Sequence, residues 1–577
     1  MISVLFIYLL SLSWMKWGNL IIDSFRDINL PVDILRGKIL YKDIVYPYGF
    51  LPPYLLSAFY FVFGVNILSA ILLGIVITVA IIVFIYKISR FFLTQAQAAL
   101  TVITFLFIFA FGFYASTGIF NFILPYSFAS TLFSLFTTGA LYFFIAFIFT
   151  ENNKKLLLFS LFIFLSILSR PDMSIFVWFG FLFSGIVAAT MDKRVNAGRL
   201  ALYIFLPVLF GFLSYLLFLK LNNAYAGFKE SIIDCILINA SNKLGVSFAG
   251  LDHILQNSWY IFQSCFYHLV AVTFLCLASF ILSRPDCSDK NDNFSVSVGI
   301  IVIFTLFMPT TQYFNPGIQY RCFPVILVAG IIAFFIRTMR RIDLKRNISL
   351  LALFVVALLM MVRVILNATP FHYGFYSLIL GLICYYVFFF DLCGKYFKSA
   401  LKLTDDNFSL YLFIFFTFSI ITSWMISAFS YSTNNVFIPD KRGGFSSRFS
   451  IETMAFWSTV EYLKDNSSRD DTVAVLPEGV GINFFADRKT SLRYYTFLPQ
   501  DVKAVGEDNM LSQLEKAHVT YVVITARDTA EYGYHAFGKD YAQKLYAWIL
   551  SNYTLVQQFG PYPFTAPEFG IAIFKHK

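Results

Sequence analysis

The chain has 577 residues, of which 58% are hydrophobic, 20% aromatic and only 13% charged. The core of a water-soluble protein of this length cannot bury so much apolar surface, so a soluble globular protein is excluded and lipid must be the solvent. The formal net charge is +10, and the position of the surplus basic residues decides which partners it implies.

Hydrophobic runs of roughly 17 to 25 residues, each long enough to cross a hydrocarbon core of about 30 Å, recur along the first three quarters of the chain. We interpret them as helices, because a helix satisfies its own backbone hydrogen bonds in lipid. About thirteen predicted spans cover residues 2–20, 67–86, 98–114, 126–149, 156–168, 174–190, 201–219, 259–282, 296–308, 323–336, 350–366, 376–390 and 410–427. The sequence therefore predicts an α-helical polytopic membrane domain over residues 1–429.

Alternate loops between these spans carry about seventeen lysines and arginines, and the other loops carry very few. Cytoplasmic loops are enriched in these residues. We therefore predict a multi-pass protein of the plasma membrane (the inner membrane of a bacterium), with a cytoplasmic N-terminus and an extracytoplasmic C-terminal domain. The surplus charge then faces anionic lipid, so the bilayer is an expected partner and nucleic acid is not. The first span lacks the basic n-region and the cleavage site of a signal peptide.

Residues 21–64 form a long first outer loop that is charged, amphipathic and interrupted by prolines. Such a loop is expected to lie along the membrane surface as short helices. Asp23, Arg26 and Asp27 are three and four residues apart and would share one helical face. A second outer loop covers residues 220–258.

Residues 430–577 alternate between strand-like and helix-like patterns. Helices are predicted at 453–465, 511–517 and 539–553, and strands at 472–476, 519–525 and 570–575. The alternation indicates a small α/β domain with a mostly parallel or mixed sheet. No glycine-rich phosphate loop follows a strand, so we expect this domain to shape acceptor access rather than to perform chemistry. None of the seven cysteines lies beyond Cys393, and the domain needs no disulfide.

Four segments of the first loop resemble the first loop of GT-C glycosyltransferases: Ile22-Asp23-Ser-Phe-Arg-Asp27, Ile34-Leu-Arg-Gly37, Leu40-Tyr-Lys-Asp43 and Tyr46-Pro-Tyr-Gly49. The resemblance is to the group that contains the protein O-mannosyltransferases and the lipid A aminoarabinose transferase (glycosyltransferase family 39-like). Ser169-Arg-Pro-Asp172 resembles a later Lys/Arg-Pro-acid element of such proteins. Ser24 follows Asp23 where the mannosyltransferases have an Asp-Glu pair, which leaves the acceptor open.

The resemblance implies a GT-C-like fold and transfer of a sugar from a polyprenyl-phosphate-linked donor to a glycan, lipid or protein acceptor. It implies catalytic roles for Asp23, as general base, and for Asp27. Such chemistry needs a base for the acceptor hydroxyl and cations for the departing lipid phosphate. No cofactor and no metal site are expected, because the sequence shows no ligand cluster; the need for a divalent metal stays open.

Seven further residues are candidates for substrate binding, and Arg321 among them is the preferred phosphate partner. They are Arg26, Lys42 and Asp43 in the first loop, and Arg170, Tyr320, Arg321 and His372 at the outer ends of predicted spans. Structural alternatives exist: Asp23 as the N-cap of a helix ending near Gly37, Asp43 as the cap of a turn, and His372 as an interfacial residue bonded to backbone.

Two other functions have to be weighed. A lipid or sugar transporter should show broken helices and ionisable residues at mid-membrane in two related halves. A polysaccharide ligase or polymerase usually places its key arginines and histidine in a large later loop, but the loop at 220–258 is modest in length. The charged candidate residues lie instead at the predicted outer surface and not at mid-membrane, which favours the glycosyltransferase.

Overall fold

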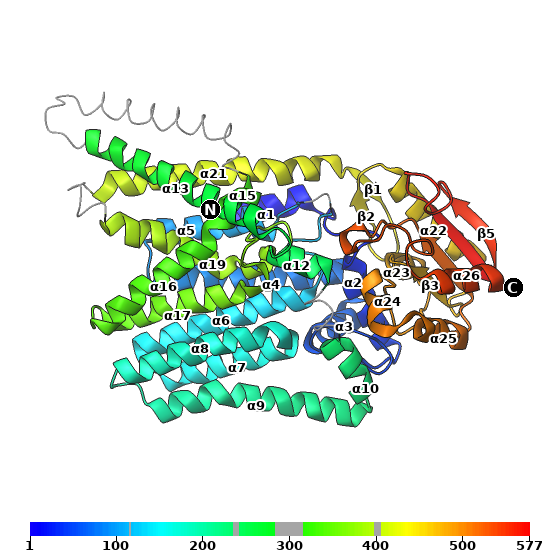
Figure 1. Ribbon diagram of the computed structural model, residues 1–577, viewed down its shortest axis with the longest axis horizontal. Coiled ribbons are helices and arrows are strands. Elements are labelled where there is room, and N and C mark those ends of the chain that lie inside the picture. Colours follow the sequence, from blue (N-terminus) through cyan, green and yellow to red (C-terminus); the bar gives the residue numbers. More distant parts are fainter. Residues whose placement is uncertain (115–116, 235–241, 283–314, 397–404) are drawn as a thin grey trace.

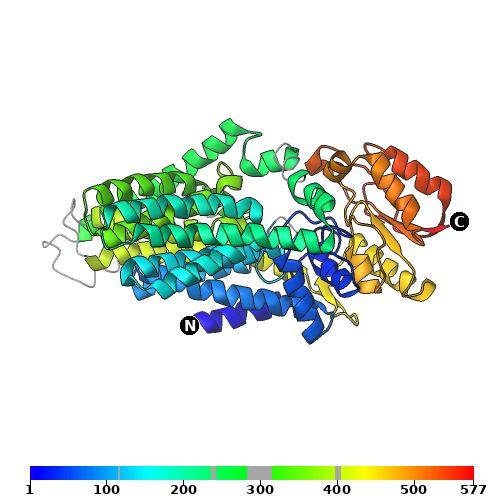
Figure 2. The same ribbon diagram turned by 90° about the horizontal axis from the view of Figure 1, so that it is seen from below.

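The computed structural model describes residues 1–114, 117–234, 242–282, 315–396 and 405–577. A bundle of helices and a C-terminal domain lie end to end along the long axis (Figures 1 and 2). The C-terminus lies at the far end of the C-terminal domain, and the N-terminal helix lies along the bundle.

Every predicted span within the described residues coincides with a helix, and the span predicted at 296–308 lies outside them. These helices are α1 Ile2–Ser13, α4 Ile67–Arg90, α5 Gln95–Thr104 continued by the π-helix η1 Phe105–Ala110, α6 Phe128–Thr150, α7 Asn153–Ser169, α8 Pro171–Met191, α9 Ala197–Asn222, α13 Ile254–Leu282, α16 Phe323–Met339, α17 Leu344–Met360, α19 Ile379–Val387 continued by η6 Phe388–Cys393, and α21 Asp405–Thr433. In the described ranges, eight helices are long and apolar enough to cross a membrane. The prediction of a polytopic helical membrane protein is confirmed.

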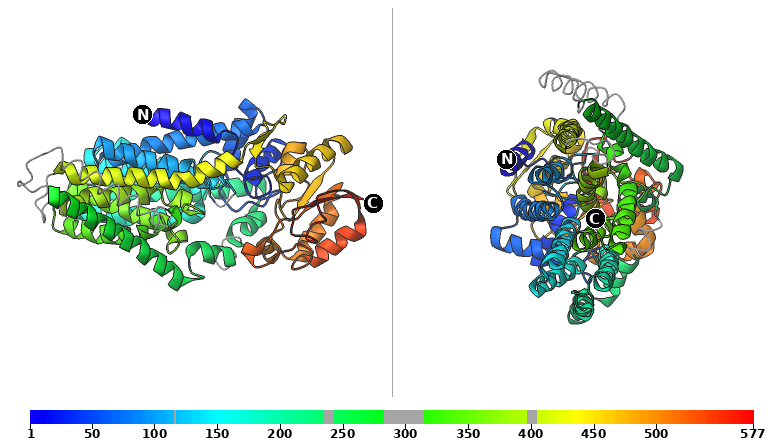
Figure 3. Two further views of the ribbon diagram at one scale, coloured as in Figure 1. Left: turned by 90° about the horizontal axis from the view of Figure 1, so that it is seen from above. Right: turned by 90° about the vertical axis from the view of Figure 1, so that its left-hand side faces the viewer.

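Local sequence signals set the ends of these helices. The Asn66 side chain caps α4, which ends with Lys87 and Arg90 in its last turn, where cations favour the helix dipole. Pro171 occupies the first position of α8. Seen end-on, α9 and α13 lie at the rim of the bundle (Figure 3). They leave many large apolar side chains exposed, as expected of a surface that faces lipid.

The basic loops that the structure describes, between α4 and α5, α6 and α7, α8 and α9, and α16 and α17, lie at the end of the bundle away from the C-terminal domain (Figure 1). Glu151 Oε1 lies 2.8 Å from Lys345 Nζ and 3.7 Å from Arg194 Nε. These two ion pairs join three of the loops. The alternation on which the predicted orientation depends is therefore present in the fold.

The first loop contains two short helices, α2 Ser24–Leu35 and α3 Leu51–Phe63, in agreement with the expectation from its sequence. Several short elements lie in the later connections: α10 Tyr225–Phe228, η2 Lys229–Asp234, α12 Lys243–Ala249, α15 Pro316–Gln319, η4 Tyr320–Cys322, η5 Val362–Val364 and α18 Gly374–Ser377.

The C-terminal domain is α/β, and its main sheet is mixed. The sheet order is β3-β4-β6-β5, with β3 and β4 parallel and the other two pairs antiparallel. The strands are β1 Val436–Ile438, β2 Phe445–Ser447, β3 Val473–Leu476, β4 Tyr521–Thr525, β5 Tyr553–Phe559 and β6 Ile571–His576; the helices are α22 Ile451–Asn466, α23 Gly481–Ala486, α24 Pro499–Val505, α25 Glu507–Ala517, η7 Ala530–Tyr532 and α26 Gln543–Asn552. Strand β5 was not predicted, because it is a largely exposed edge strand without an apolar face.

The C-terminal domain packs directly on the first loop. The Tyr495 hydroxyl donates to Asp33 Oδ2 of α2 at 2.6 Å. Gly481 at the start of α23 lies so close to the segment around the start of α2 that a Cβ there would be 2.6 Å from the Leu20 carbonyl oxygen and 3.1 Å from the Phe25 ring. Backbone hydrogen bonds also join Val45 to Arg493, Ile67 to Arg442 and Ser446 to Met15. The loop and the domain therefore form one structural unit at this end of the bundle.

Candidate functional site

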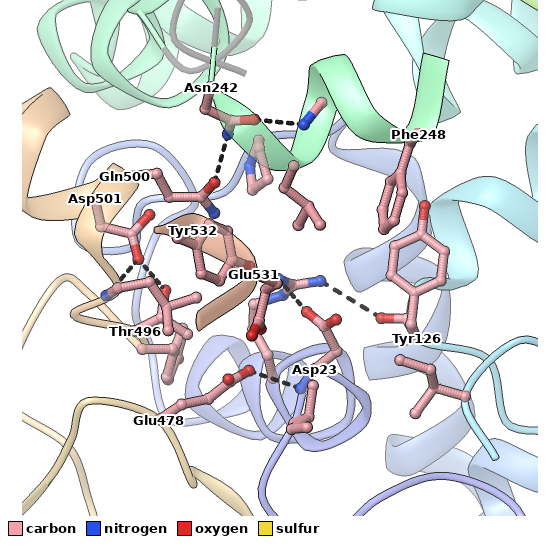
Figure 4. A pocket seen from close by; sticks show the side chains of 18 of the residues that line it. Asp23, Tyr126, Asn242, Phe248, Glu478, Thr496, Gln500, Asp501, Glu531 and Tyr532 are labelled. Carbon is pink, nitrogen blue, oxygen red and sulfur yellow. Dashed lines mark hydrogen bonds and ion pairs between the residues drawn. The ribbon is translucent and has the colours of Figure 1, made fainter. Parts of the chain in front are cut away.

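A cavity of about 620 Å³ lies where the first loop, the second loop and the C-terminal domain meet (Figure 4). Its volume is in the usual range for a site that binds a small ligand. Its polar and aromatic lining includes Asp23, Arg26, Tyr48, Tyr126, Glu230, Asn242, Arg363, His372, Tyr373, Glu478, Tyr494, Tyr495, Gln500, Asp501, Arg527, Glu531 and Tyr532. Three of the residues predicted from the sequence are among them: Asp23, Arg26 and His372.

Asp23 immediately precedes α2 and lines the cavity. Its Oδ1 accepts a hydrogen bond from Arg26 Nη1 at 3.0 Å. It has a φ of 52°, a region that costs a residue with a side chain on the order of 1–3 kcal/mol. The Asp23 side chain makes no hydrogen bond that caps the helix. Asp23 therefore occupies the N-cap position of α2, but its side chain does not cap the helix.

Arg26 lies between two carboxylates, as the spacing predicted. Its guanidinium is 3.0 Å from Asp23 and 3.4 Å from Asp27. Asp27, however, is buried outside the cavity: its Oδ2 accepts from the backbone N–H of Phe128 at 3.0 Å and from the Tyr46 hydroxyl at 3.4 Å. Burial raises the pKa of the Asp27 carboxyl. Asp27 thus ties α2 to the first residue of α6.

Two of the segments that carry the GT-C resemblance, Tyr46–Gly49 and Ser169–Asp172, contact each other. The N–H of Gly49 donates to the Ser169 carbonyl at 3.0 Å, and a side chain at Gly49 would collide with the chain there. Arg170 is fully buried and donates to both carboxylate oxygens of Asp172, at 3.2 and 2.7 Å. Its guanidinium also lies against the face of the Tyr48 ring. Arg170 supports the cavity wall through Tyr48, which itself lines the cavity.

Four other predicted residues lie away from the cavity. Arg321 donates to Asn257 Oδ1 at 2.8 Å and to the carbonyl of Leu366 at 3.0 Å. Tyr320 is buried among aromatic rings, and Lys42 is exposed. Asp43 Oδ2 accepts from the N–H of Ile39 at 2.9 Å, so Asp43 caps a turn, as the structural alternative to substrate binding predicted.

His372 lines the cavity with only 6% of its surface exposed, and its ring stacks on Phe248 with centroids 4.9 Å apart. Its Nε2 has no hydrogen-bond partner within the described residues. Burial lowers the pKa of His372 to about 3, so the imidazole is neutral at physiological pH. A buried ring nitrogen without a partner is costly unless a ligand or water satisfies it.

Arg363 lines the same wall and was not predicted, because the sequence pattern placed it inside a span over 350–366. Helix α17 ends at Met360 instead, which releases Arg363 to the cavity. Its guanidinium lies 4.5 Å from the centre of the Tyr373 ring and 3.6 Å from Asp172, a carboxylate that Arg170 already neutralises. An arginine within an otherwise apolar run was the available signal.

The C-terminal domain contributes a carboxylate next to Asp23, which the sequence analysis did not select. Glu478 is 3% exposed; its Oε1 accepts from the backbone N–H of Asp23 at 2.8 Å, and its Oε2 accepts from Arg527 Nε at 3.2 Å. Arg527 also pairs with Glu531. Burial, and then the charge of Asp23, raise the pKa of Glu478 to about 7. The signal was a turn after a buried strand, where α/β domains often place functional groups.

Hydrogen bonds between the second loop and the C-terminal domain close another side of the cavity. Asn242 Nδ2 donates to Gln500 Oε1 at 2.7 Å, and the Tyr494 hydroxyl donates to Glu230 Oε1 at 2.6 Å. Asp501 accepts from Thr496 and Leu498, and these residues face the same space (Figure 4). A search of the described residues finds no group of three or more His, Cys, Asp or Glu side chains placed to hold a metal ion.

Comparison with solved structures establishes the class of fold. The archaeal oligosaccharyltransferase AglB from Archaeoglobus fulgidus, in complex with an inhibitory peptide and a dolichol-phosphate, matches over 100% of this chain and 74% of its own, with 13% identity and a TM-score of 0.50. This chain therefore has the fold of that polytopic membrane protein, and the predicted resemblance is confirmed at the level of fold.

Two further structures are similar at lower scores. The A. fulgidus oligosaccharyltransferase in complex with Zn and sulfate covers 91% of this chain and 68% of its own, at 13% identity and a TM-score of 0.49. ArnT from Cupriavidus metallidurans bound to undecaprenyl phosphate covers 99% and 97%, at 10% identity and a TM-score of 0.43. No protein-family model and no curated protein sequence matches the chain.

Proposed function

We propose that this protein is an integral membrane glycosyltransferase that moves a sugar from a polyprenyl-phosphate-linked donor to an acceptor on the extracytoplasmic face of the membrane. The observation that carries the proposal is the Asp23 carboxylate on the wall of a ligand-sized cavity at one end of the bundle, with Arg26 and Arg363 on the same wall. A GT-C fold is compatible with this reaction but does not by itself define it.

In the proposed reaction Asp23 accepts the proton of an acceptor hydroxyl while the oxygen attacks the anomeric carbon of the sugar. The bond from that carbon to the lipid phosphate breaks, and the phosphate departs with the negative charge. A positioned base contributes about 10²–10⁴-fold to such a step. Arg26 holds the Asp23 carboxylate through the 3.0 Å ion pair.

Arg363 is the proposed partner of the donor phosphate, in place of Arg321. Among its contacts in the described structure the carboxylate of Asp172 is 3.6 Å away and already bonded to Arg170, so Arg363 retains positive charge for a ligand. Arg321 is engaged by carbonyl and amide oxygens outside the cavity. Neutral His372 offers its Nε2 to the same ligand.

The archaeal AglB structure supports a lipid-linked donor, because that protein was observed with a dolichol-phosphate. Its inhibitory peptide makes a protein acceptor one option beside glycan and lipid.

Asp23→Asn is the variant that tests the proposal. It keeps the size of the side chain and removes its basicity, so we expect folded protein whose turnover falls about a hundredfold or more. Transfer from polyprenyl-phosphate sugars would be measured in liposomes, with Asp508→Asn, a change in an exposed ion pair, as the matched control. Turnover of Asp23→Asn near that of the wild type would contradict the proposal and favour a transporter.

A further inference from the structure

We propose that Glu478 is a positioning residue for Asp23, so that the C-terminal domain supplies part of the catalytic geometry and does not only shape access to it. This inference rests on the proposed function, in which Asp23 is the base. The sequence led us to expect that the C-terminal domain performs no part of the chemistry. In the present proposal Glu478 does not touch the substrate and acts on the reaction only through Asp23.

The contact between Glu478 and Asp23 restrains the backbone at the point where restraint is needed. Asp23 has a positive φ, which residues with a side chain avoid unless the surroundings hold them there. Glu478 Oε1 accepts the N–H of that residue at 2.8 Å. Without this acceptor the peptide can rotate toward an extended conformation, and the carboxylate would then leave its place beside Arg26.

The segment before Asp23 is held by a separate set of hydrogen bonds. Asn19 Oδ1 accepts from the N–H groups of Ile21 and Ile22, at 2.8 and 2.9 Å. These bonds form a turn that ends one residue before Asp23. The next N–H along the chain is the one that Glu478 accepts, so Glu478 continues the restraint into the residue that carries the base.

Glu478 is itself held by hydrogen bonds at both carboxylate oxygens and at its backbone carbonyl. Its second oxygen accepts from Arg527 Nε at 3.2 Å, and its backbone carbonyl accepts from the Thr525 hydroxyl at 2.8 Å. With 3% of its surface exposed, the side chain has little freedom to move. A buried and fully bonded acceptor can hold a neighbouring group to a fraction of an ångström.

The two parts of the chain meet closely enough to transmit this restraint. Gly481, three residues after Glu478, lies against the Leu20 carbonyl and the Phe25 ring with no room for a side chain. Phe25 also packs on Phe484 and Phe485 of α23. The turn that carries Glu478 therefore cannot shift relative to the start of α2 without breaking this packing.

Two conservative substitutions separate a positioning role from a structural one. Glu478→Gln keeps an oxygen at the same reach for the Asp23 N–H and replaces the oxygen that accepts from Arg527 with an uncharged NH2 donor. Glu478→Asp keeps the charge and withdraws the oxygen by one methylene. A positioning role predicts that Gln preserves turnover and that Asp loses it, and a mere ion pair with Arg527 predicts the reverse order.

The kinetic experiment measures kcat and the donor KM of both variants with a polyprenyl-phosphate sugar in liposomes. We expect Glu478→Asp to lower kcat by about 10- to 100-fold, because misplacement of a reacting group by about 1 Å costs on that order. The donor KM should stay within about threefold, since the phosphate contacts are untouched. Glu478→Gln should stay within about fivefold of the wild-type kcat.

A double-mutant cycle tests whether Glu478 acts through Asp23. In the Asp23→Asn background, Glu478→Asp should change kcat by less than about threefold, because the group that it positions is already lost. Equal factors in both backgrounds would overturn the inference, as would a Glu478→Gln variant that is worse than Glu478→Asp.

Hydrogen–deuterium exchange of the peptide covering residues 19–27 supplies a measurement that needs no sugar. Exchange there should be faster on the order of tenfold in Glu478→Asp and close to wild type in Glu478→Gln. Glu531→Gln is the matched control for exchange, because Glu531 pairs with Arg527 as Glu478 does and accepts no hydrogen bond from the backbone N–H of Asp23, which Glu478 accepts. Unchanged exchange in Glu478→Asp overturns the positioning role even if sugar transfer is found. Faster exchange in a protein that transfers no sugar would overturn the proposed function instead, while the contact with Asp23 stands.

Discussion

At the scale of single residues, the sequence located one side of the cavity. Asp23 and Arg26 follow the first apolar run at a helical spacing that brings their side chains together, and local spacing survives folding. Arg363 and Glu478 gave no comparable signal, because each reaches the cavity only through long-range packing. The polar groups of a site that lie far apart in sequence are those that local patterns miss.

The contrast between Arg363 and Arg321 leads to a prediction at this scale. Arg363→Ala should raise the donor KM by about 10- to 100-fold, the loss expected for a charge-assisted contact with a phosphate. Arg321→Ala should leave the donor KM within about threefold and mainly lower thermal stability, because it frees buried Asn257 and Leu366 acceptors. Initial rates over a donor concentration series, with an unfolding scan of each variant in detergent, would measure both. A larger effect on KM from Arg321→Ala would return the phosphate role to that residue.

At the scale of secondary-structure elements, α2 is the element that connects the cavity to the bundle. Its outer end carries Asp23, while Asp27, one turn later, accepts the N–H of Phe128 at the start of α6. Asp33, farther along, accepts from Tyr495 of the C-terminal domain. One helix of the first loop therefore contacts the membrane helices and the C-terminal domain at once, and its amphipathic sequence reflects this double burial.

Substitution of Asp27 should separate an anchoring role from a catalytic one. Asp27→Asn keeps an acceptor for Phe128, so we expect it to retain turnover within about tenfold of wild type, far above that of Asp23→Asn. Asp27→Ala removes the acceptor and leaves Arg26 with one partner fewer, which should destabilise the protein by about 3 kcal/mol. The measurements are the unfolding midpoint in detergent and transfer in liposomes. A stable but inactive Asp27→Asn protein would make Asp27 a catalytic residue.

In the whole molecule, the basic loops that the structure describes lie at the end of the bundle away from the C-terminal domain (Figure 1). The cavity lies at the other end, between the first loop, the second loop and that domain. Lysine and arginine are retained on the cytoplasmic side of membrane proteins. The cavity and the C-terminal domain should therefore face the extracytoplasmic side, where a donor flipped across the bilayer would be met.

Reporter fusions test this orientation. An enzyme that is active only outside the cytoplasm, fused after Lys577, should be active. The same enzyme fused within the loop between α8 and α9, next to Lys193 and Arg194, should be inactive. A reporter active only inside the cytoplasm is the control and should show the opposite pattern. Cytoplasmic activity at Lys577 would place the cavity on the wrong side for the proposed donor.

Properties that depend on local composition and period could be predicted from the sequence. The solvent of the chain, the long apolar helices within the described residues, the alternation of charged loops and about half of the elements of the C-terminal domain follow from runs of apolar residues. The exposed edge strand β5 was not predicted, because its side chains do not alternate regularly between a buried and an exposed face.

The composition of the cavity depends on long-range packing and could not be predicted from the sequence. Arg321 and Asp27 lie outside the cavity, and Arg363 lines it because α17 ends at Met360. Glu478 accepts a hydrogen bond from the backbone of Asp23, although the two residues are more than four hundred positions apart in the chain. The physical reason is that a hydrogen bond or ion pair depends on distance in space, and pairs so far apart in the chain leave no periodic signal in it. The predicted base lies on a loop, and the group that holds it lies on the C-terminal domain.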